Sequence, residues 1–395
     1  MEKTYTSVLT PPGMAAIAVV GVLGTDALKI VSRYFVPRKR AATYQSPSGA
    51  ESTPLQNILA SLSRGPVLGW FQEGRQRDEV LLVLRQPQPN WYLELHCHGG
   101  PAVVSWILDS LGRAGAVLVS SEEWYRLTES DPIRRAALGV LTKALTWRTC
   151  AVLLDQMHGA WRKVVSELIQ ALEHDQLLAH HLSERLAELV SVGQHLGHPF
   201  RVALAGAPNV GKSTLINTLL GYSRAITSPL PGTTRDVVTA EIACDGWPVQ
   251  LLDTVGWRCT DDPLEREAIE RARHTWQQAD LVLWLLDISR DPILPPVPLS
   301  RMLFVVNKVD LPHRWTPNSL PTLSDFYVCV SAQAGTGLDE LIAAITNRLV
   351  PNPPQPGEAV PFTPHLCETV LALHHAIVRS DWQSARSYAV LLNNP

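Results

Sequence analysis

A glycine-rich stretch in the middle of the chain, GAPNVGKST at residues 206–214, contains the residue types that can hold a nucleotide phosphate. It fits the pattern GxxxxGK[ST] and lies between a predicted buried strand and a predicted helix, so backbone N–H groups at the helix N-terminus can surround a phosphate. In such a loop Lys212 places its charge on the terminal phosphates, where it assists catalysis, and Ser213 offers a hydroxyl to Mg²⁺. A glycine-rich turn can match this pattern by chance, so the interpretation depends on companion motifs.

Two companion segments lie where a GTPase senses its metal and its γ-phosphate. DTVG at residues 253–256 ends a predicted strand, which suits Asp253 as a carboxylate near Mg²⁺ and Gly256 as the sensor of the γ-phosphate. GTTRD at residues 232–236 lies between the phosphate loop and Asp253. This position is typical of a switch segment.

Two more segments indicate which base is bound. NKVD at residues 307–310 follows an apolar strand, and Asp310 can accept hydrogen bonds from both N1–H and N2–H of guanine, a donor pair that adenine lacks. The pair Ser331 and Ala332 follows another short apolar strand and completes the base site in the expected order. The five motifs together predict a GTPase domain that prefers GTP to ATP.

These motifs do not include the residue that would orient the attacking water. Many GTPases place a glutamine directly after the DxxG glycine, but Trp257 stands there and an indole cannot polarise water. Asn209 could help to hold a monovalent cation where an arginine finger would otherwise neutralise charge, and Glu265 could orient the water. Taken alone, Glu265 is better explained as a solvated charge on an amphipathic helix.

The elements that must position these motifs divide the chain of 395 residues into several regions. Strand-like and helix-like runs alternate over residues 1–120, which indicates an α+β domain. Helical spacing predicts two or three long helices within residues 121–198, and strands alternate with helices over residues 199–350. Residues 351–395 begin with a Pro-rich linker and contain one predicted helix, at residues 368–378. The fold class is therefore α/β.

Composition limits the partners and the compartment. A net charge of -3 provides no general basic field, so we expect neither a membrane nor DNA as a partner, and any RNA contact must be local. The six cysteines include no CxxC pair, which argues against a disulfide framework. No signal peptide and no apolar run of about 20 residues is evident, so we expect a cytoplasmic protein.

Motifs in two parts of the chain carry a family resemblance. TPPG at residues 10–13 and LELHCHGGP at residues 93–101 lie in the first domain, and GAPNVGKSTLIN, GTTRDV and DPLEREAIERA lie in the GTPase domain. In this combination, over about residues 4–350, the chain resembles the tRNA-modification GTPase family known as MnmE or TrmE. GTPases of the Era and Der types share only the second set.

The resemblance implies an N-terminal folate-binding-like domain that forms a homodimer, a helical domain and an inserted P-loop GTPase domain. It implies that Glu265 orients the water and that Ser213 and Thr234 bind Mg²⁺. It further implies a K⁺ ion held by Asn209, Ser228, Leu230 and Thr233, which pairs two GTPase domains. A flavoprotein partner would join in modifying the wobble uridine of tRNA at its 5-position. Glu94 matches the carboxylate of the family's folate site.

With the resemblance included, the residues expected to contact GTP are Asn209, Val210, Gly211, Lys212, Ser213, Thr214, Ser228, Thr233, Thr234, Asp253, Thr254, Gly256, Asn307, Lys308, Asp310, Ser331 and Ala332.

The chain departs from the family pattern at several positions. The family's C-terminal CxGK motif is not found, because no Gly-Lys pair follows Cys367, so we expect a C-terminally shortened member. Gly21 stands where the family has an arginine, and the lysine of its NGK motif has no counterpart. Since a folate glutamate tail needs cationic partners, this argues against binding of a 5-formyltetrahydrofolate-type cofactor. Val255 and Trp257 add bulk to the switch.

We therefore expect a K⁺-stimulated GTPase that acts in tRNA wobble-uridine modification with a flavoprotein. Two alternatives remain open: a GTP-driven assembly or regulatory switch that has lost the tRNA chemistry, and a GTP-binding scaffold with little hydrolysis.

Overall fold

The computed structural model describes residues 3–11, 13–38, 54–87, 89–222, 239–254, 263–296, 301–320 and 327–393. The chain forms two compact units, Met1–Asp131 and Pro132–Pro395. The first unit extends past residue 120, where we predicted the helical region to begin. The reason is that helix α4 (Ser121–Thr128) packs on the first sheet through Trp124, whose side chain is 1% exposed. Within the described residues, no helix is both long enough and apolar enough to cross a membrane.

The first unit is built on a seven-stranded sheet in the order β3-β4-β5-β6-β2-β1-β7. β1 and β7 pair in parallel and the other neighbours are antiparallel. Its elements are β1 (Thr4–Val8), β2 (Ile17–Gly24), α1 (Ala27–Val31), β3 (Phe35–Pro37), α2 (Pro54–Leu62), β4 (Val67–Glu73), β5 (Gln76–Gln86), β6 (Trp91–His98), α3 (Pro101–Arg113), β7 (Ala116–Leu118) and α4.

The two faces of this sheet differ because side chains alternate along a strand. Val20 and Val22 of β2 and their partners Leu95 and Leu93 of β6 are fully buried in one hydrophobic core, together with side chains of α1, α2 and α3. Gly21, between the two valines, pairs with Glu94 on the opposite face. That second face is covered in part by α4.

The second unit begins with five helices: α5 (Pro132–Leu141), α6 (Trp147–Met157), α7 (Ala160–His174), α8 (Gln176–Glu188) and α9 (Val190–Gln194). The prediction of two or three long helices was wrong because local stop and start signals interrupt the apolar pattern. Thr146 forms a capping box with Thr149 at the start of α6. Gly159 takes the left-handed conformation before α7, and the Asp175 side chain caps α8.

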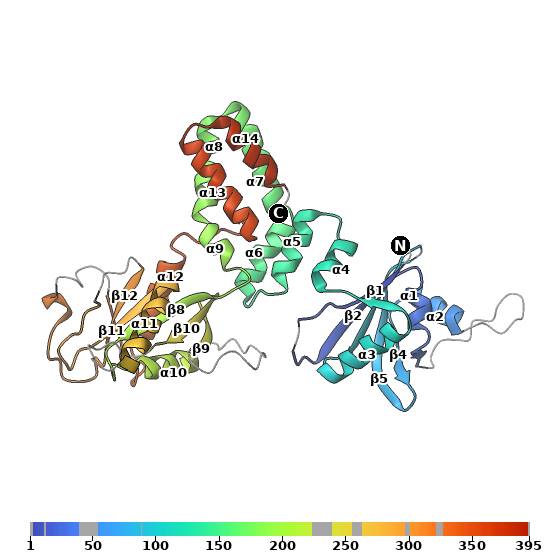
Figure 1. Cartoon of the computed structure of the whole chain (residues 1–395), viewed down its shortest axis with the longest axis horizontal. Helices are drawn as coiled ribbons and strands as arrows, with labels where there is room; N and C mark the ends of the chain where they lie inside the picture. The colour runs from blue at the N-terminus through green and yellow to red at the C-terminus, as the bar shows by residue number, and fades with distance from the viewer. Residues whose placement is uncertain are drawn as a thin grey trace, which may run out of the picture. The chain divides into compact units, whose positions relative to one another are not determined.

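The last part of the chain returns to these helices. α13 (Pro364–Val378) packs against α8, and α14 (Trp382–Leu391) packs against α7 (Figure 1). The indole Nε1–H of the fully buried Trp161 in α7 donates to the Leu392 carbonyl at 3.0 Å. We predicted one helix here and the structure has two, both integrated into the helical core. The residues between α9 and α13 therefore form a domain inserted in the helical part.

The inserted part is a six-stranded sheet in the order β13-β12-β11-β8-β10-β9, parallel except for β9. α10 and α12 share the core on one face of this sheet, and α11 contributes Ala272 and Trp276 to the core on the other. The elements are β8 (Phe200–Gly206), α10 (Lys212–Tyr222), β9 (Thr239–Cys244), β10 (Trp247–Asp253), α11 (Pro263–Gln278), β11 (Leu281–Asp287), β12 (Met302–Asn307), the 3-10 turn η1 (Pro317–Ser319), β13 (Tyr327–Cys329) and α12 (Leu338–Leu349).

Polar residues end the central parallel strands at one edge of this sheet: Asp253 on β10, Asp287 on β11 and Asn307 on β12, beside Gly206 on β8. The carboxyl ends of parallel strands form the ligand-binding edge of open α/β sheets. A functional site is therefore expected at this edge.

Candidate nucleotide site

The phosphate loop joins β8 to α10 and has a backbone that depends on its glycines. Gly206 and Gly211 have φ values of +135° and +101°, where L side chains are strained, and Asn209 has a φ of 60°. A Cβ atom at Gly211 would lie 2.4 Å from Nδ2 of Asn307. Gly211 therefore allows the base-binding segment to approach the loop closely.

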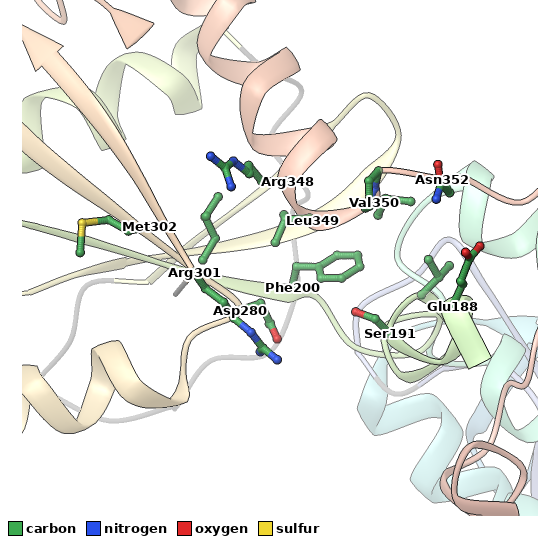
Figure 2. Close-up of a pocket in the computed structure, with 13 residues that line it drawn as sticks. Glu188, Ser191, Phe200, Asp280, Arg301, Met302, Arg348, Leu349, Val350 and Asn352 are labelled. Carbon is green, nitrogen blue, oxygen red and sulfur yellow. The ribbon is translucent and has the colours of Figure 1, made fainter. Parts of the chain in front are cut away.

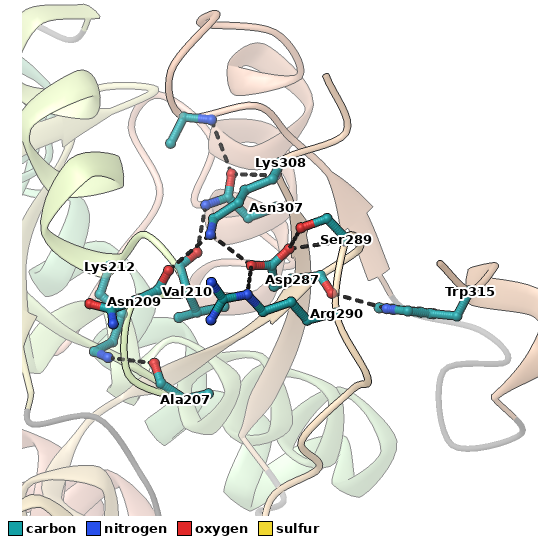
Figure 3. A network of polar contacts seen from close by, with 11 residues as sticks. Ala207, Asn209, Val210, Lys212, Asp287, Ser289, Arg290, Asn307, Lys308 and Trp315 are labelled. Atoms are coloured by element: carbon teal, nitrogen blue, oxygen red, sulfur yellow. Dashed lines mark hydrogen bonds and ion pairs between the residues drawn. The ribbon is translucent and has the colours of Figure 1, made fainter. Parts of the chain in front are cut away.

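Lys212 is the first residue of α10 and is only 8% exposed. Its ammonium group donates to the Gly206 carbonyl oxygen at 3.4 Å and to the Ala207 carbonyl oxygen at 3.1 Å, and Figure 3 shows the second of these contacts. Burial lowers the pKa of Lys212, and the nearby Asp253 carboxylate opposes that shift. An anion bound in the loop would stabilise the lysine charge.

Ser213 and Asp253 form the oxygen-rich part of the site. The Ser213 hydroxyl donates to Oδ2 of Asp253 at 2.5 Å, so the two motifs meet in space. A hydroxyl and a carboxylate beside a phosphate site form a donor set that suits Mg²⁺, which prefers oxygen ligands. Thr214 follows with an exposed side chain.

The Thr254 side chain faces inward. Its hydroxyl donates to the Leu204 carbonyl at 2.5 Å and accepts from the Trp276 indole at 3.1 Å. Thr254 is 9% exposed. Its side chain therefore connects the end of β10 to β8 and α11, and its hydroxyl is already hydrogen-bonded within the protein. Sequence reasoning missed Trp276.

The Asn307 side chain connects the base-binding segment to two other loops. Nδ2 donates to the Val210 carbonyl at 2.9 Å, and Oδ1 accepts from the Ala332 and Lys308 backbone N–H groups at 3.0 and 2.8 Å (Figure 3). Asn307 is 1% exposed. The amide thus joins the phosphate loop, NKVD and the Ser331-Ala332 pair into one rigid assembly.

Asp310 is held by Ser331. The Ser331 hydroxyl donates to Oδ1 of Asp310 at 2.5 Å and accepts from the Ala334 backbone N–H at 3.0 Å. The fully buried Ser331 therefore sets the direction of the carboxylate that we expect to read guanine.

Asp287 belongs to the site although sequence reasoning missed it. Its Oδ2 lies 2.7 Å from the Lys308 ammonium and 3.9 Å from Nε of Arg290, and its Oδ1 accepts from Ser289 (Figure 3). Burial tends to raise the pKa of Asp287, but hydrogen bonds from Lys308 and Ser289 outweigh it, and the net pKa is lowered. An acidic residue directly after the apolar run LVLWLL, as at Asp253, was the available signal.

Several predicted residues lie outside the described part of the chain: Ser228, Leu230, Thr233, Thr234, Val255, Gly256 and Trp257. Glu265 lies in α11, but its side chain is likewise outside the description.

A cavity lined by described residues lies at each end of the strands of the inserted part. One of about 270 Å³ lies between residues 207–210 of the phosphate loop and the segment after β11 that includes Asp287 and Arg290. The other, of about 350 Å³, lies at the opposite, amino-terminal ends of the strands, beside the helical part. Figure 2 shows Asp280 and Arg301 at these strand ends, with Ser191 and Asn352 toward the helices. No glycine-rich loop lines this second cavity. Of these two cavities, only the first adjoins a phosphate site.

In the first unit, the Glu94 carboxylate already has hydrogen-bonding partners within the chain. Oε1 accepts from Nε of Arg85 at 2.8 Å and from the Tyr92 hydroxyl at 3.2 Å, and Oε2 lies 3.1 Å from Nε2 of His96. Burial, with the nearby Glu94 charge, raises the pKa of Tyr92 to about 12. Tyr92 therefore stays neutral and donates.

A phosphate loop, an oxygen pair suited to Mg²⁺ and an NKxD loop, joined at the carboxyl edge of a parallel sheet, define the class of protein as a P-loop GTPase. A family model described as 50S ribosome-binding GTPase matches residues 201–308, and one described as GTP-binding protein TrmE N-terminus matches residues 4–126.

Curated relatives match along most of the chain. It is 34% identical to a tRNA modification GTPase MnmE of Thermus thermophilus, over 89% of this chain and 83% of that protein. It is 31% identical to the protein of the same name from Symbiobacterium thermophilum, over 87% and 82%. A crystal structure of Era in complex with MgGDPNP and 16S ribosomal RNA is 30% identical over 45% of this chain and 64% of that chain, with a TM-score of 0.30. This chain belongs to the MnmE family of tRNA modification GTPases.

Proposed function

We propose that this GTPase binds GTP with Mg²⁺ at the edge formed by β8, β10, β11 and β12, and uses GTP hydrolysis in the modification of tRNA wobble uridines at the 5-position. The observation that carries the assignment is the Asn307 side chain, which joins the phosphate loop to the two segments expected to hold guanine. A base and a triphosphate can bind with defined orientation only when these segments have fixed relative positions.

The chain's own residues have separate roles in this proposal. Backbone N–H groups of the phosphate loop and Lys212 bind the phosphates, and Asp310 accepts from guanine. Ser213 and Thr234 hold the metal with help from Asp253, and Asn209, Val210, Gly211, Thr214 and Lys308 line the nucleotide. Bound Mg²⁺ would neutralise charge on the phosphates.

Orientation of water and charge neutralisation are assigned to Glu265 and to a K⁺ site. In the proposal, Glu265 holds the attacking water, and Asn209, Ser228, Leu230 and Thr233 surround K⁺, which pairs the GTPase domains of a homodimer. The Lys308 ammonium donates to the Asn209 carbonyl at 2.9 Å, and Asn209 has a left-handed backbone. These restraints fix the backbone from which the Asn209 side chain extends, which supports its assignment as a cation ligand.

Family membership supports tRNA as the substrate, a flavoprotein as the partner and the cytoplasm as the location. The test is mass spectrometry of tRNA nucleosides from cells that lack the gene, complemented with the wild type or with Lys212→Ala. We expect 5-substituted wobble uridines to return with the wild type alone. If they are unchanged by deletion, the tRNA role is wrong and a GTP-driven assembly switch is favoured.

Hydrolysis is tested separately with the purified chain in KCl and in NaCl. We expect faster turnover in KCl, and strong loss of turnover in Glu265→Gln with GTP affinity retained. Equal turnover in both salts would contradict the K⁺ site. If single-turnover cleavage is absent even in KCl, the chain is a GTP-binding scaffold.

A further inference from the structure

The second face of the first sheet carries the position at which the family resemblance implies a folate. Gly21 of β2 and Glu94 of β6 are direct cross-strand partners, so position 21 and the carboxylate share this face. An arginine at position 21 and a free carboxylate at position 94 would give a folate one cation and one acceptor. Whether folate fits therefore depends on what now fills the space above this pair.

The space above Gly21 is filled by Trp124. A Cβ atom at position 21 would lie 2.4 and 2.6 Å from the indole carbons Cζ2 and Cη2, closer than real Cβ contacts allow. Trp124 is 1% exposed and packs edge-to-face on Tyr92, with ring centroids 5.5 Å apart. No side chain can extend from position 21 while this indole is in place.

Trp124 is held in this position by α4. The helix begins with a capping box in which the Ser120 hydroxyl accepts from the Glu123 backbone N–H, and the Glu123 carboxylate accepts from the Ser120 backbone N–H. Trp124 follows directly, in the first turn. The indole is therefore part of a fixed element and not of a loop tip.

The carboxylate below the indole is also unavailable. A pterin ring presents two adjacent N–H donors, which bind a carboxylate best when each donor meets one of its two oxygens. Both oxygens of Glu94 already have donors, from Arg85 and Tyr92 on one and His96 on the other. Glu94 is 7% exposed, so a ligand could reach it only after these contacts break.

The charges around Glu94 also disfavour folate binding. Arg85 supplies a positive charge beside Glu94, and Nε of its guanidinium lies 2.8 Å from Oε1 of the carboxylate. A folate carries carboxylates on its glutamate tail and would need that cation for itself. Binding would then leave the buried Glu94 charge without its strongest partner, which is costly.

We propose that Trp124 and the Glu94 cluster, defined as Arg85, Tyr92, Glu94 and His96, close the folate site of the first unit from within, so that this unit binds no reduced folate. The residues present do not fit the cofactor that the family resemblance implies.

Equilibrium dialysis of the full chain against 5-formyltetrahydrofolate is the direct test. We expect no saturable binding up to millimolar ligand. Saturable binding in the micromolar range would overturn the proposal. GTP turnover is measured on the same preparation, so a failure of the GTPase assignment is visible as lost turnover, independently of the folate result.

A double-mutant cycle tests the packing itself. Gly21→Ala should lower the Tm by several degrees in the wild-type background, because the added methyl meets the indole. In a Trp124→Phe background, where the smaller ring leaves room, the same change should cost much less. An equal cost of Gly21→Ala in both backgrounds would show that Trp124 does not fill this space.

If Gly21→Ala does not fold alone, recovery of a folded chain in Gly21→Ala/Trp124→Phe supports the proposal, and failure of the double variant to fold while Trp124→Phe folds counts against it. Trp147→Ala is the control, because Trp147 lies in the second unit and is 86% exposed. We expect its Tm to match that of the wild type.

Discussion

The Lys308 ammonium lies 2.7 Å from the Asp287 carboxylate and 2.9 Å from the Asn209 carbonyl, so one side chain joins the end of β11 to the phosphate loop. The ion pair is mostly buried, with Asp287 8% exposed. Charge-assisted bonds in such places restrict geometry as well as adding energy. The position of Lys308 over the nucleotide site thus depends on a residue outside the known motifs of the sequence.

Asp287→Asn should weaken GDP and GTP binding roughly tenfold, because a hydrogen bond to a charged group contributes about 1.5 kcal/mol or more. Titration with a fluorescent guanine nucleotide measures this. Asp245→Asn is the matched control, since that carboxylate pairs with Arg148 in an exposed position and does not line the cavity beside the phosphate loop. Unchanged affinity in Asp287→Asn would mean that Lys308 keeps its position without the ion pair.

Asp310→Asn should exchange base preference. In the proposed site the carboxylate accepts from two guanine donors, whereas the amide keeps one acceptor oxygen and turns its NH₂ group toward the other donor, so GTP binding should weaken about a hundredfold or more. Xanthine has a carbonyl where guanine has its amino group, so the amide of the variant can donate to it. Competition between GTP and xanthosine triphosphate measures the relative affinity of the variant for the two bases. Continued preference for GTP would place the base elsewhere.

Gly211→Ala should abolish nucleotide binding and lower the Tm. The added methyl would lie 2.4 Å from the Asn307 amide, and the φ of +101° is strained for alanine. Gly159→Ala is a close control, with a φ of +109° and no atom near the added methyl. The Tm of Gly159→Ala should fall only by the cost of the backbone strain, and this variant should bind GTP with the affinity of the wild type.

Gln156→Leu should destabilise the helical part by about 1–3 kcal/mol, because it leaves one buried and one half-buried backbone group without the side-chain partner. The Gln156 amide donates to the Glu358 carbonyl at 3.0 Å and accepts from the Val360 N–H at 3.1 Å. Urea unfolding gives the change. Gln170→Leu, on the exposed side of α7, should be nearly neutral. Equal costs for both would rule out a role for the paired amide.

His374 should make stability depend on pH. Burial, followed by the charges of His180 and His375, lowers the pKa of His374 below its ordinary 6.5, with Glu184 opposing. A depressed folded-state pKa means that the folded chain binds the proton more weakly than the unfolded chain. The contribution of neutral His374 to the free energy of unfolding is therefore present above pH 6.5. It is lost as the pH falls through the lower pKa that His374 has in the folded chain.

The measurement is the urea midpoint from about pH 5 to about pH 8, for the wild type and His374→Gln. We expect the variant to show a flatter profile on the acid side. The exposed His365 gives the control His365→Gln, which should keep the wild-type profile. A His374→Gln profile parallel to that of the wild type would contradict the prediction.

The strands and motifs of the inserted part could be predicted because their signals are local. The strand predicted at residues 200–206 is β8, and the segments around Asp253 and Asn307 follow β10 and β12 as expected. The helices of the helical part were harder to predict from the sequence. α14 was missed because WQSARSYAVL has a short apolar face, and its stability comes from burial against α7.

What the sequence by itself determined is the GTPase chemistry: the phosphate loop, Asp253 and NKVD are contiguous patterns whose roles follow from strand-turn-helix geometry. What only the tertiary structure decided is how distant residues meet. Trp124 above Gly21 and Lys308 beside Asp287 join segments with no shared sequence pattern. Such pairs arise from the packing of whole elements, because burial and charge pairing act on proximity in space and leave no period or motif along the chain.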